Sequence, residues 1–190
     1  MKRPTWILLF IFAALVGLLF YINRPGGASQ DDLDLGTEAA GAAQFLFTDE
    51  SGIPLEIKIS DKEGNVVEIS RNQEGIWMLI QPKETEANQG KAEAAASQVT
   101  ALRIVSTPDL APEFAGLVPP SYMLSVNFSG GESFTVDIGD LTTTQSGYYA
   151  SMSIDDNIIV ISKSGVDSLL TLLSNPPYPD ASTPEPSYGN

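Results

Sequence analysis

The sequence predicts an α+β fold, with an antiparallel sheet of about seven or eight strands and two helices packed on it. Two observations carry this prediction. Short segments with alternating apolar and polar residues are separated by Gly, Asn and Asp turns, as in β-hairpins. Two further segments, each after a group of strands, have apolar residues at helical spacing. Runs of strands followed by a helix are typical of the α+β class.

The composition limits the chemistry that the chain can support. Its 190 residues are enough for one compact domain with an anchor or tail. Histidine and cysteine are absent, which removes the commonest general base, thiol nucleophiles, disulfides and thiolate metal sites. All 24 acidic residues lie from Asp31 onward, with only seven basic residues among them. Such an acidic body disfavours binding to nucleic acids and to anionic lipids.

Residues 1–24 are predicted to be a signal anchor. The uncharged run from Trp6 to Ile22 is roughly 26 Å long as a helix, close to the ~30 Å of a bilayer core. Lys2 and Arg3 favour a cytoplasmic N-terminus, which predicts a single-pass protein of the cell membrane with its body on the extracytoplasmic side. A signal peptide cleaved after the small residues 26–28 and a buried core helix are the alternatives.

The linker and the first half of the domain follow. Residues 25–43 read as a flexible acidic linker, and residues 44–175 as the extracytoplasmic α+β domain. Residues 53–70 predict a hairpin around Gly64-Asn65, and residues 75–82 a third strand that Pro82 ends. We expect a helix capped by Asn88 to follow. Its apolar stripe consists of Ala92, Ala95, Ala96, Val99 and Leu102.

The second half repeats this order of elements. Residues 122–139 predict a hairpin around Gly130-Gly131, and residues 147–162 two strands joined by a turn at Asp155-Asp156-Asn157. Ser164 and Asp167 resemble a capping box at the start of a second helix. Its predicted apolar stripe consists of Val166, Leu169, Leu170 and Leu173. Residues 176–190 are rich in proline and are expected to be a disordered tail.

The two halves match at an offset of about 70 residues, which suggests a duplicated strand-strand-strand-helix unit. Ile57 corresponds to Val126, and Trp77 to Tyr148 or Tyr149. Alternating strands also match one another by chance, so a chance similarity is the alternative.

Several segments resemble a bacterial family described as domain of unknown function 4340. They are "GIWMLIQP", the alanine-rich helix, "EFAGLVPP", "VNFSGGESFTVDIGD" and "GYYASMS", within roughly residues 45–174. The chain departs from the family pattern at Asn88 and at Val118, where a Gly-Leu-x-x-Pro spacing is compressed. The resemblance implies a membrane-anchored extracytoplasmic domain, in some relatives found alongside ABC transporter components of the gliding-motility type. It implies no catalytic residues.

Aromatic residues are the candidate interaction sites. Trp77 lies in an alternating strand and is expected to fill the core rather than to hold a ligand. Tyr148 and Tyr149 are neighbours in a strand and must point to opposite faces. One is therefore expected in the core and the other at the surface, where it is a candidate for binding a ligand or partner.

The polar clusters carry no predicted catalytic, cofactor or metal site. "DDLDLG" at residues 31–36 lacks the further ligands of a calcium loop and reads as a charged linker. Asp61, Glu63 and Asn65 flank a turn. Lys163 lies between two serines, but serine is expected at a helix start, so a Ser-Lys dyad is not assigned.

Three functions remain open at this point. We expect a non-enzymatic, membrane-anchored envelope protein that acts through protein contacts, with a role beside an ABC-type export or gliding-motility-like transporter. A binding module for an envelope polymer or a small ligand is the alternative. A hydrolase with an unrecognised site is the third.

Overall fold

The structure is a computed structural model that describes residues 44–153 and 155–180. The predicted anchor, the predicted linker and residues 181–190 of the predicted tail lie outside the described residues. Within the described part, no helix is both long and apolar enough to cross a membrane.

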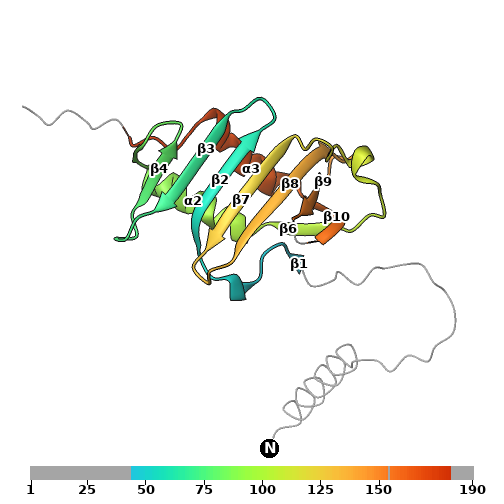
Figure 1. The fold of residues 1–190 in the computed structure, drawn as a ribbon, viewed down its shortest axis with the longest axis horizontal. Coiled ribbons are helices and arrows are strands. Elements are labelled where there is room, and N and C mark those ends of the chain that lie inside the picture. Colours follow the sequence, from blue (N-terminus) through green and yellow to red (C-terminus); the bar gives the residue numbers. More distant parts are fainter. Residues whose placement is uncertain (1–43, 154, 181–190) are drawn as a thin grey trace, which may run out of the picture. The chain divides into compact units, whose positions relative to one another are not determined.

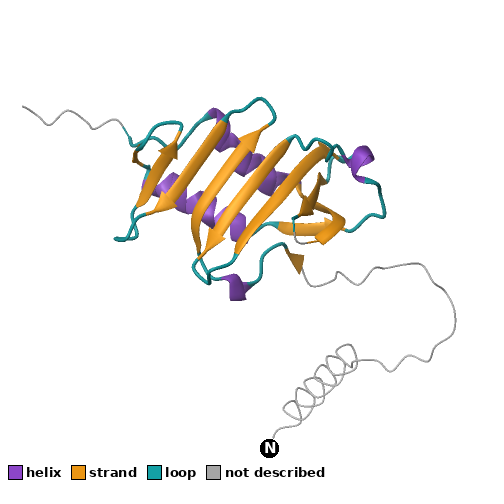
Figure 2. Ribbon diagram, in the orientation of Figure 1, coloured by secondary structure: helices purple, strands orange, loops and turns teal. Residues whose placement is uncertain are grey.

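The described strands form one antiparallel ten-stranded sheet (Figures 1 and 2), so the predicted α+β class is confirmed. Their order across the sheet is β1-β6-β10-β9-β8-β7-β2-β3-β4-β5. The bounds are β1 Gln44–Phe45, β2 Pro54–Asp61, β3 Val66–Arg71, β4 Trp77–Gln81, β5 Thr85–Glu86, β6 Arg103–Ser106, β7 Tyr122–Phe128, β8 Ser133–Leu141, β9 Gly147–Met152 and β10 Asp155–Ser162.

Two α-helices, α2 (Gln89–Thr100) and α3 (Lys163–Ser174), cover one face of the sheet and contact each other (Figure 1). Short 3-10 helices, η1 (Asp49–Ser51) and η2 (Pro112–Ala115), lie in the connections. The main core is between the helices and the sheet. As predicted, α2 contributes its alanine-rich stripe, whose small side chains let helix and sheet approach closely. The largest fully buried side chains include Trp77, Ile57, Ile59, Ile69, Leu79, Leu102, Leu124 and Ile161.

The strand order is the same on either side of the β2–β7 pair. In one direction β2, β3, β4 and β5 follow one another, and in the other β7, β8, β9 and β10. Each series is followed in the chain by a helix of 12 residues. At the centre, Ile57 of β2 lies directly opposite Val126 of β7.

The sheet has more strands than the sequence predicted. The additional strands β1, β5 and β6 contain two, two and four residues. Alternation is not detectable over so few residues, and these segments are strands because a neighbouring strand is available to pair with them. The predicted turn at Asp155-Asp156-Asn157 is also wrong, because β10 already begins at Asp155.

The helix ends differ in how well they were predicted. The Asn88 cap is confirmed, since its side chain accepts a hydrogen bond from the backbone N–H of Lys91 at 3.0 Å. The predicted capping box of α3 is wrong: Ser162 is the N-cap, so Ser164 and Asp167 lie inside the helix. The domain continues past residue 175, where Pro177 is buried and its carbonyl accepts a hydrogen bond from the N–H of Asn88.

Candidate functional site

Trp77 is a core residue, as predicted. It is the first residue of β4, its side chain is 1 % exposed, and it packs in the main core. The indole Nε1–H donates to Oε2 of Glu93 on α2 at 2.9 Å. The guanidinium of Arg71 lies over the indole ring, 4.3 Å from its centroid. The tryptophan is therefore enclosed on its polar edge as well as its apolar faces.

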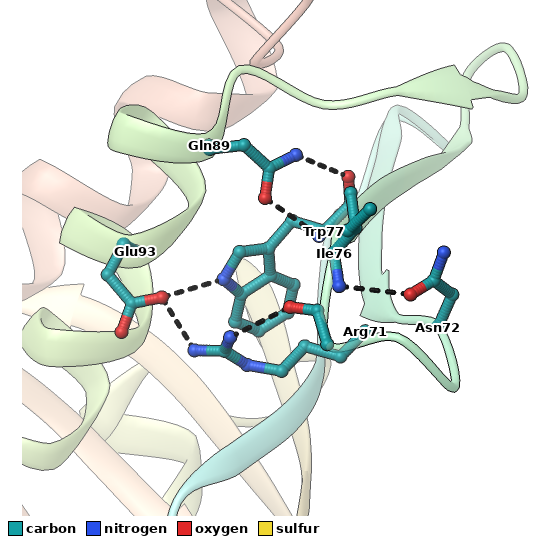
Figure 3. A network of polar contacts seen from close by, with 7 residues as sticks. Arg71, Asn72, Ile76, Trp77, Gln89 and Glu93 are labelled. Carbon is teal, nitrogen blue, oxygen red and sulfur yellow. Dashed lines mark hydrogen bonds and ion pairs between the residues drawn. The ribbon is translucent and has the colours of Figure 1, made fainter.

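The groups around Trp77 join α2 to strands β3 and β4 (Figure 3). The Gln89 side chain accepts from the backbone N–H of Trp77 and donates to its carbonyl, both at 2.9 Å. Arg71 donates to Glu93 at 2.5 Å and to the carbonyl of Gly75 at 3.1 Å. The hydrogen bond from Trp77, helped by Arg71, lowers the pKa of Glu93. Because these groups are directed at one another, the network holds the helix against the sheet.

Tyr148 takes part in a similar contact in the second half. It is half-buried on the helix-covered face, and its hydroxyl donates to Oδ1 of Asp167 at 2.8 Å. Lys163 pairs with the same carboxylate. Burial, together with Asp167, raises the pKa of Tyr148 to about 12, while Lys163 and then Tyr148 lower the pKa of Asp167. The Tyr148 ring is therefore held by the domain itself.

Tyr149 points to the other face of the sheet, as the alternation of a strand requires. There it packs against a second, smaller cluster made by Ala115, Leu117 and Ile158, together with Leu110. Three of these residues belong to the connection between β6 and β7, residues 107–121, which we call the docking loop. The two tyrosines thus lie on opposite faces, as predicted, and both pack against other parts of the domain.

The docking loop is held firmly on the sheet. Ala115 and Leu117 are buried in the cluster at Tyr149. Gly139 of β8 lies so close beneath the loop that a Cβ there would collide with the carbonyl oxygen of Ala115. Gly116 has a φ of 67°, a left-handed conformation that glycine adopts without strain. The N–H of Ser121 closes the loop by donating to the carbonyl of Ile138 at 2.9 Å.

The same loop presents two large apolar side chains to solvent. Phe114 is 78 % exposed and Val118 is 64 % exposed, and each is next in sequence to a buried residue of the loop. A buried Ala115 and Leu117 therefore fix the backbone from which the exposed side chains project. Two of the large apolar side chains that the described residues expose therefore lie on this one anchored loop.

The surroundings of the loop are acidic. Asp109 and Glu113 belong to the loop itself, and the Asp140 carboxylate lies against Gly116. The sequence contains no lysine or arginine between Arg103 and Lys163.

Sequence reasoning did not identify the docking loop as a site. The segment "DLAPEFAGLVPP" reads as a proline-rich connection, and its exposed residues have no periodicity that would separate them from the buried ones. The available signal was an aromatic residue next to an acidic one within a proline-rich connection. Among residues 44–153 and 155–180, no group of three or more acidic side chains is placed to hold a metal ion.

Comparison of the chain with protein-family models, with curated proteins and with solved structures finds no match. The resemblance to domain of unknown function 4340 therefore stays a prediction.

Proposed function

We propose that this chain is a membrane-anchored extracytoplasmic protein that binds a partner protein of the cell envelope through its docking loop. The observation that carries the proposal is the 78 % exposure of Phe114 on a loop that is anchored by the buried residues Ala115 and Leu117. An aromatic side chain on a rigid support is the usual form of an interface anchor.

The energetics favour a contact at this loop. Burying a Phe or Val side chain contributes about 1.5–3 kcal/mol each, so Phe114 and Val118 together supply a useful part of a binding free energy. Binding also costs free energy for each side chain or loop that has to be ordered. Because Ala115 and Leu117 already fix the loop, that cost falls mainly on the two exposed side chains.

Charge favours a protein rather than a lipid or nucleic-acid partner. The acidic residues in and beside the loop, Asp109, Glu113 and Asp140, would repel phosphate groups. The predicted anchor at residues 1–24 would place the domain outside the cytoplasmic membrane, beside other membrane proteins. An accessory role beside an ABC-type export or gliding-motility-like transporter is the more specific form of the proposal, and it rests on the family resemblance.

We further infer that the domain arose by duplication of a strand-strand-strand-helix unit. Support comes from the matching strand order on either side of the Ile57–Val126 pair. In addition, each half has an aromatic residue of its third strand that donates to the acid at the fifth position of its helix. On this reading the docking loop lies in the connection between the two copies, where it is free to differ in length and sequence.

The alternative of an envelope-polymer or small-ligand binder relied on an exposed tyrosine. Tyr148 is bonded to Asp167, and Tyr149 packs against the docking loop. Neither tyrosine therefore supports the alternative of a polymer or small-ligand binder.

The test is chemical crosslinking in native membranes followed by mass spectrometry. The wild-type chain is compared with Phe114→Ser and with Ile53→Ser, a control at a side chain that is also exposed, at 58 %, but lies outside the docking loop. We expect one membrane-protein partner to be lost from Phe114→Ser and retained by Ile53→Ser. Retention of the same partner by both variants would contradict the proposal.

A further inference from the structure

A cavity of about 710 Å³ lies at the base of the docking loop. Thr107, Pro108, Asp109 and Leu110 of the loop form one wall. The rest of the lining comes mainly from the strands and consists of Gln44, Ile104, Met152, Asn157, Ile158 and Ile159. The cavity lining thus mixes apolar side chains with polar ones and includes the acidic residue Asp109.

The edge of β10 at this cavity is incompletely paired. Strand β6 pairs with β10 only at Val160 and Ile161, and β6 ends at Ser106. Among the described residues, no strand pairs with Ile158 and Ile159 on that side of β10. A strand edge with unpaired backbone groups is a template for adding a further strand.

The phase of the β9–β10 ladder shows which backbone groups face the cavity. The N–H of Lys163 donates to the carbonyl of Ser146, and the register is regular from Ile158 to Ser162. Hydrogen-bonded and non-hydrogen-bonded pairs alternate along an antiparallel ladder. The backbone N–H and C=O of Ile159 therefore point toward β9, and those of Ile158 point away from β9, to the side of the cavity.

We propose that this cavity accepts an extended cationic segment of the partner protein, which adds as a strand to the backbone of Ile158. The inference rests on the proposed function, because it assigns a second segment of the same partner to the cavity beside the docking loop. In strand addition, the backbone supplies affinity and alternate side chains enter pockets. An apolar side chain of the segment would face Leu110, on the face of the sheet away from the helices, and its lysine or arginine residues would lie near Asp109.

Charge complementarity selects this occupant over a segment of the same chain. Residues 25–43 contain Asp31, Asp32, Asp34 and Glu38 and no basic residue. That segment would be repelled by Asp109 and by the other acidic residues between positions 104 and 162, where no basic residue compensates them. A cationic segment is attracted by the same charges.

The test uses the full chain in detergent and a fluorescent synthetic peptide of alternating lysine and valine. Comparison peptides have glutamate in place of lysine, or a fully N-methylated backbone, or the sequence of residues 29–43 of this chain. We expect only the unmodified lysine-valine peptide to bind, and to slow hydrogen exchange at the amide of Ile158. Asp109→Lys should weaken its binding about tenfold, because it places like charges together. Glu86→Lys, the same charge change on β5 at the opposite edge of the sheet, should leave binding unchanged.

Four results would overturn the inference. They are no binding of the lysine-valine peptide, binding that leaves exchange at Ile158 unchanged, equal effects of the two charge reversals, and preferred binding of the acidic peptide. Protection of Ile158 that rises with protein concentration in the absence of peptide would assign the edge to a second copy instead. The assay requires no native partner. Loss of crosslinks in Phe114→Ser without peptide binding would therefore leave the proposed function standing and remove only this inference.

Discussion

Replacing Trp77 by alanine tests the account of the core. The indole is 1 % exposed, and deleting a buried aromatic side chain costs about 3–5 kcal/mol. This is a large share of the ~5–15 kcal/mol that stabilises a whole domain. For a domain of this size we expect the melting temperature to fall by about 10–20 °C.

Trp77→Phe separates the packing from the hydrogen bond. Phenylalanine keeps most of the apolar surface but cannot donate to Glu93, which accepts from the indole at 2.9 Å. A hydrogen bond to a charged group contributes about 1.5–3 kcal/mol. The Glu93 side chain is 57 % exposed, so solvent screening reduces the expected loss to about 1 kcal/mol. The phenylalanine variant should therefore melt between the wild type and the alanine variant.

The assay is thermal unfolding of residues 42–180 followed by circular dichroism, because both substitutions remove the tryptophan that fluorescence would report. Phe114→Ala is the matched control: it also removes an aromatic side chain, but one that is 78 % exposed. It should leave the melting temperature unchanged. An unchanged melting temperature in Trp77→Ala, or an equal fall in Phe114→Ala, would refute this account of the core.

Four further predictions follow from the sequence and the structure. The full chain should stay with membranes after carbonate washing and expose its body to protease only from outside; a soluble species that starts near Ser29 would contradict this. Asn88→Ala should lower the free energy of unfolding in urea by about 0.5–2 kcal/mol through loss of the helix cap, and no change would refute that role. Asp137→Asn should raise the melting temperature at pH 7, because burial raises the pKa of this carboxyl and its Oδ1 is buried without a hydrogen-bond partner. The gain in melting temperature from Asp137→Asn should grow as the pH rises through 3.8, the ordinary pKa of an aspartate. It should vanish below that pH, because the wild-type carboxyl is then protonated and uncharged in both the folded and the unfolded chain. A gain that does not depend on pH would contradict the argument. Gly139→Ala should displace the docking loop and speed its proteolysis. The control is Gly90→Ala, whose added Cβ would meet only the Asn88 side chain, at 3.5 Å. Equal proteolysis of the loop in the two variants would contradict the prediction.

The longer elements could be predicted because their patterns are local. Alternation identified β2, β3, β4, β7 and β8, and the alanine stripe identified α2 with its cap at Asn88. The short strands β1, β5 and β6 could not be found in this way, because pairing with distant segments makes them strands. The pairing of Ile57 with Val126 is a tertiary contact, which local patterns do not reveal.

The candidate site was harder to predict than the core. The burial of Trp77 followed from its place in an alternating strand, whereas its partner Glu93 required the position of α2 against β4. Tyr148 and Tyr149 were placed correctly on opposite faces, but their neighbours come from α3 and the docking loop. In the docking loop, the 3-10 helix η2 (Pro112–Ala115) is too short to give a periodic pattern that would separate exposed from buried residues. Only the contact with β8 and β9 shows that Phe114 faces solvent while Ala115 is buried.

Site-specific photo-crosslinking in native membranes tests the central claim most directly. A benzophenone amino acid is placed at position 114 or 118 of the docking loop, or at the control position 53, whose native side chain is also exposed. The account predicts one discrete crosslinked product with the same membrane-protein partner from positions 114 and 118, and none from position 53. Equal crosslinking from position 53, or none from the docking loop while the chain remains folded and in the membrane, would contradict it.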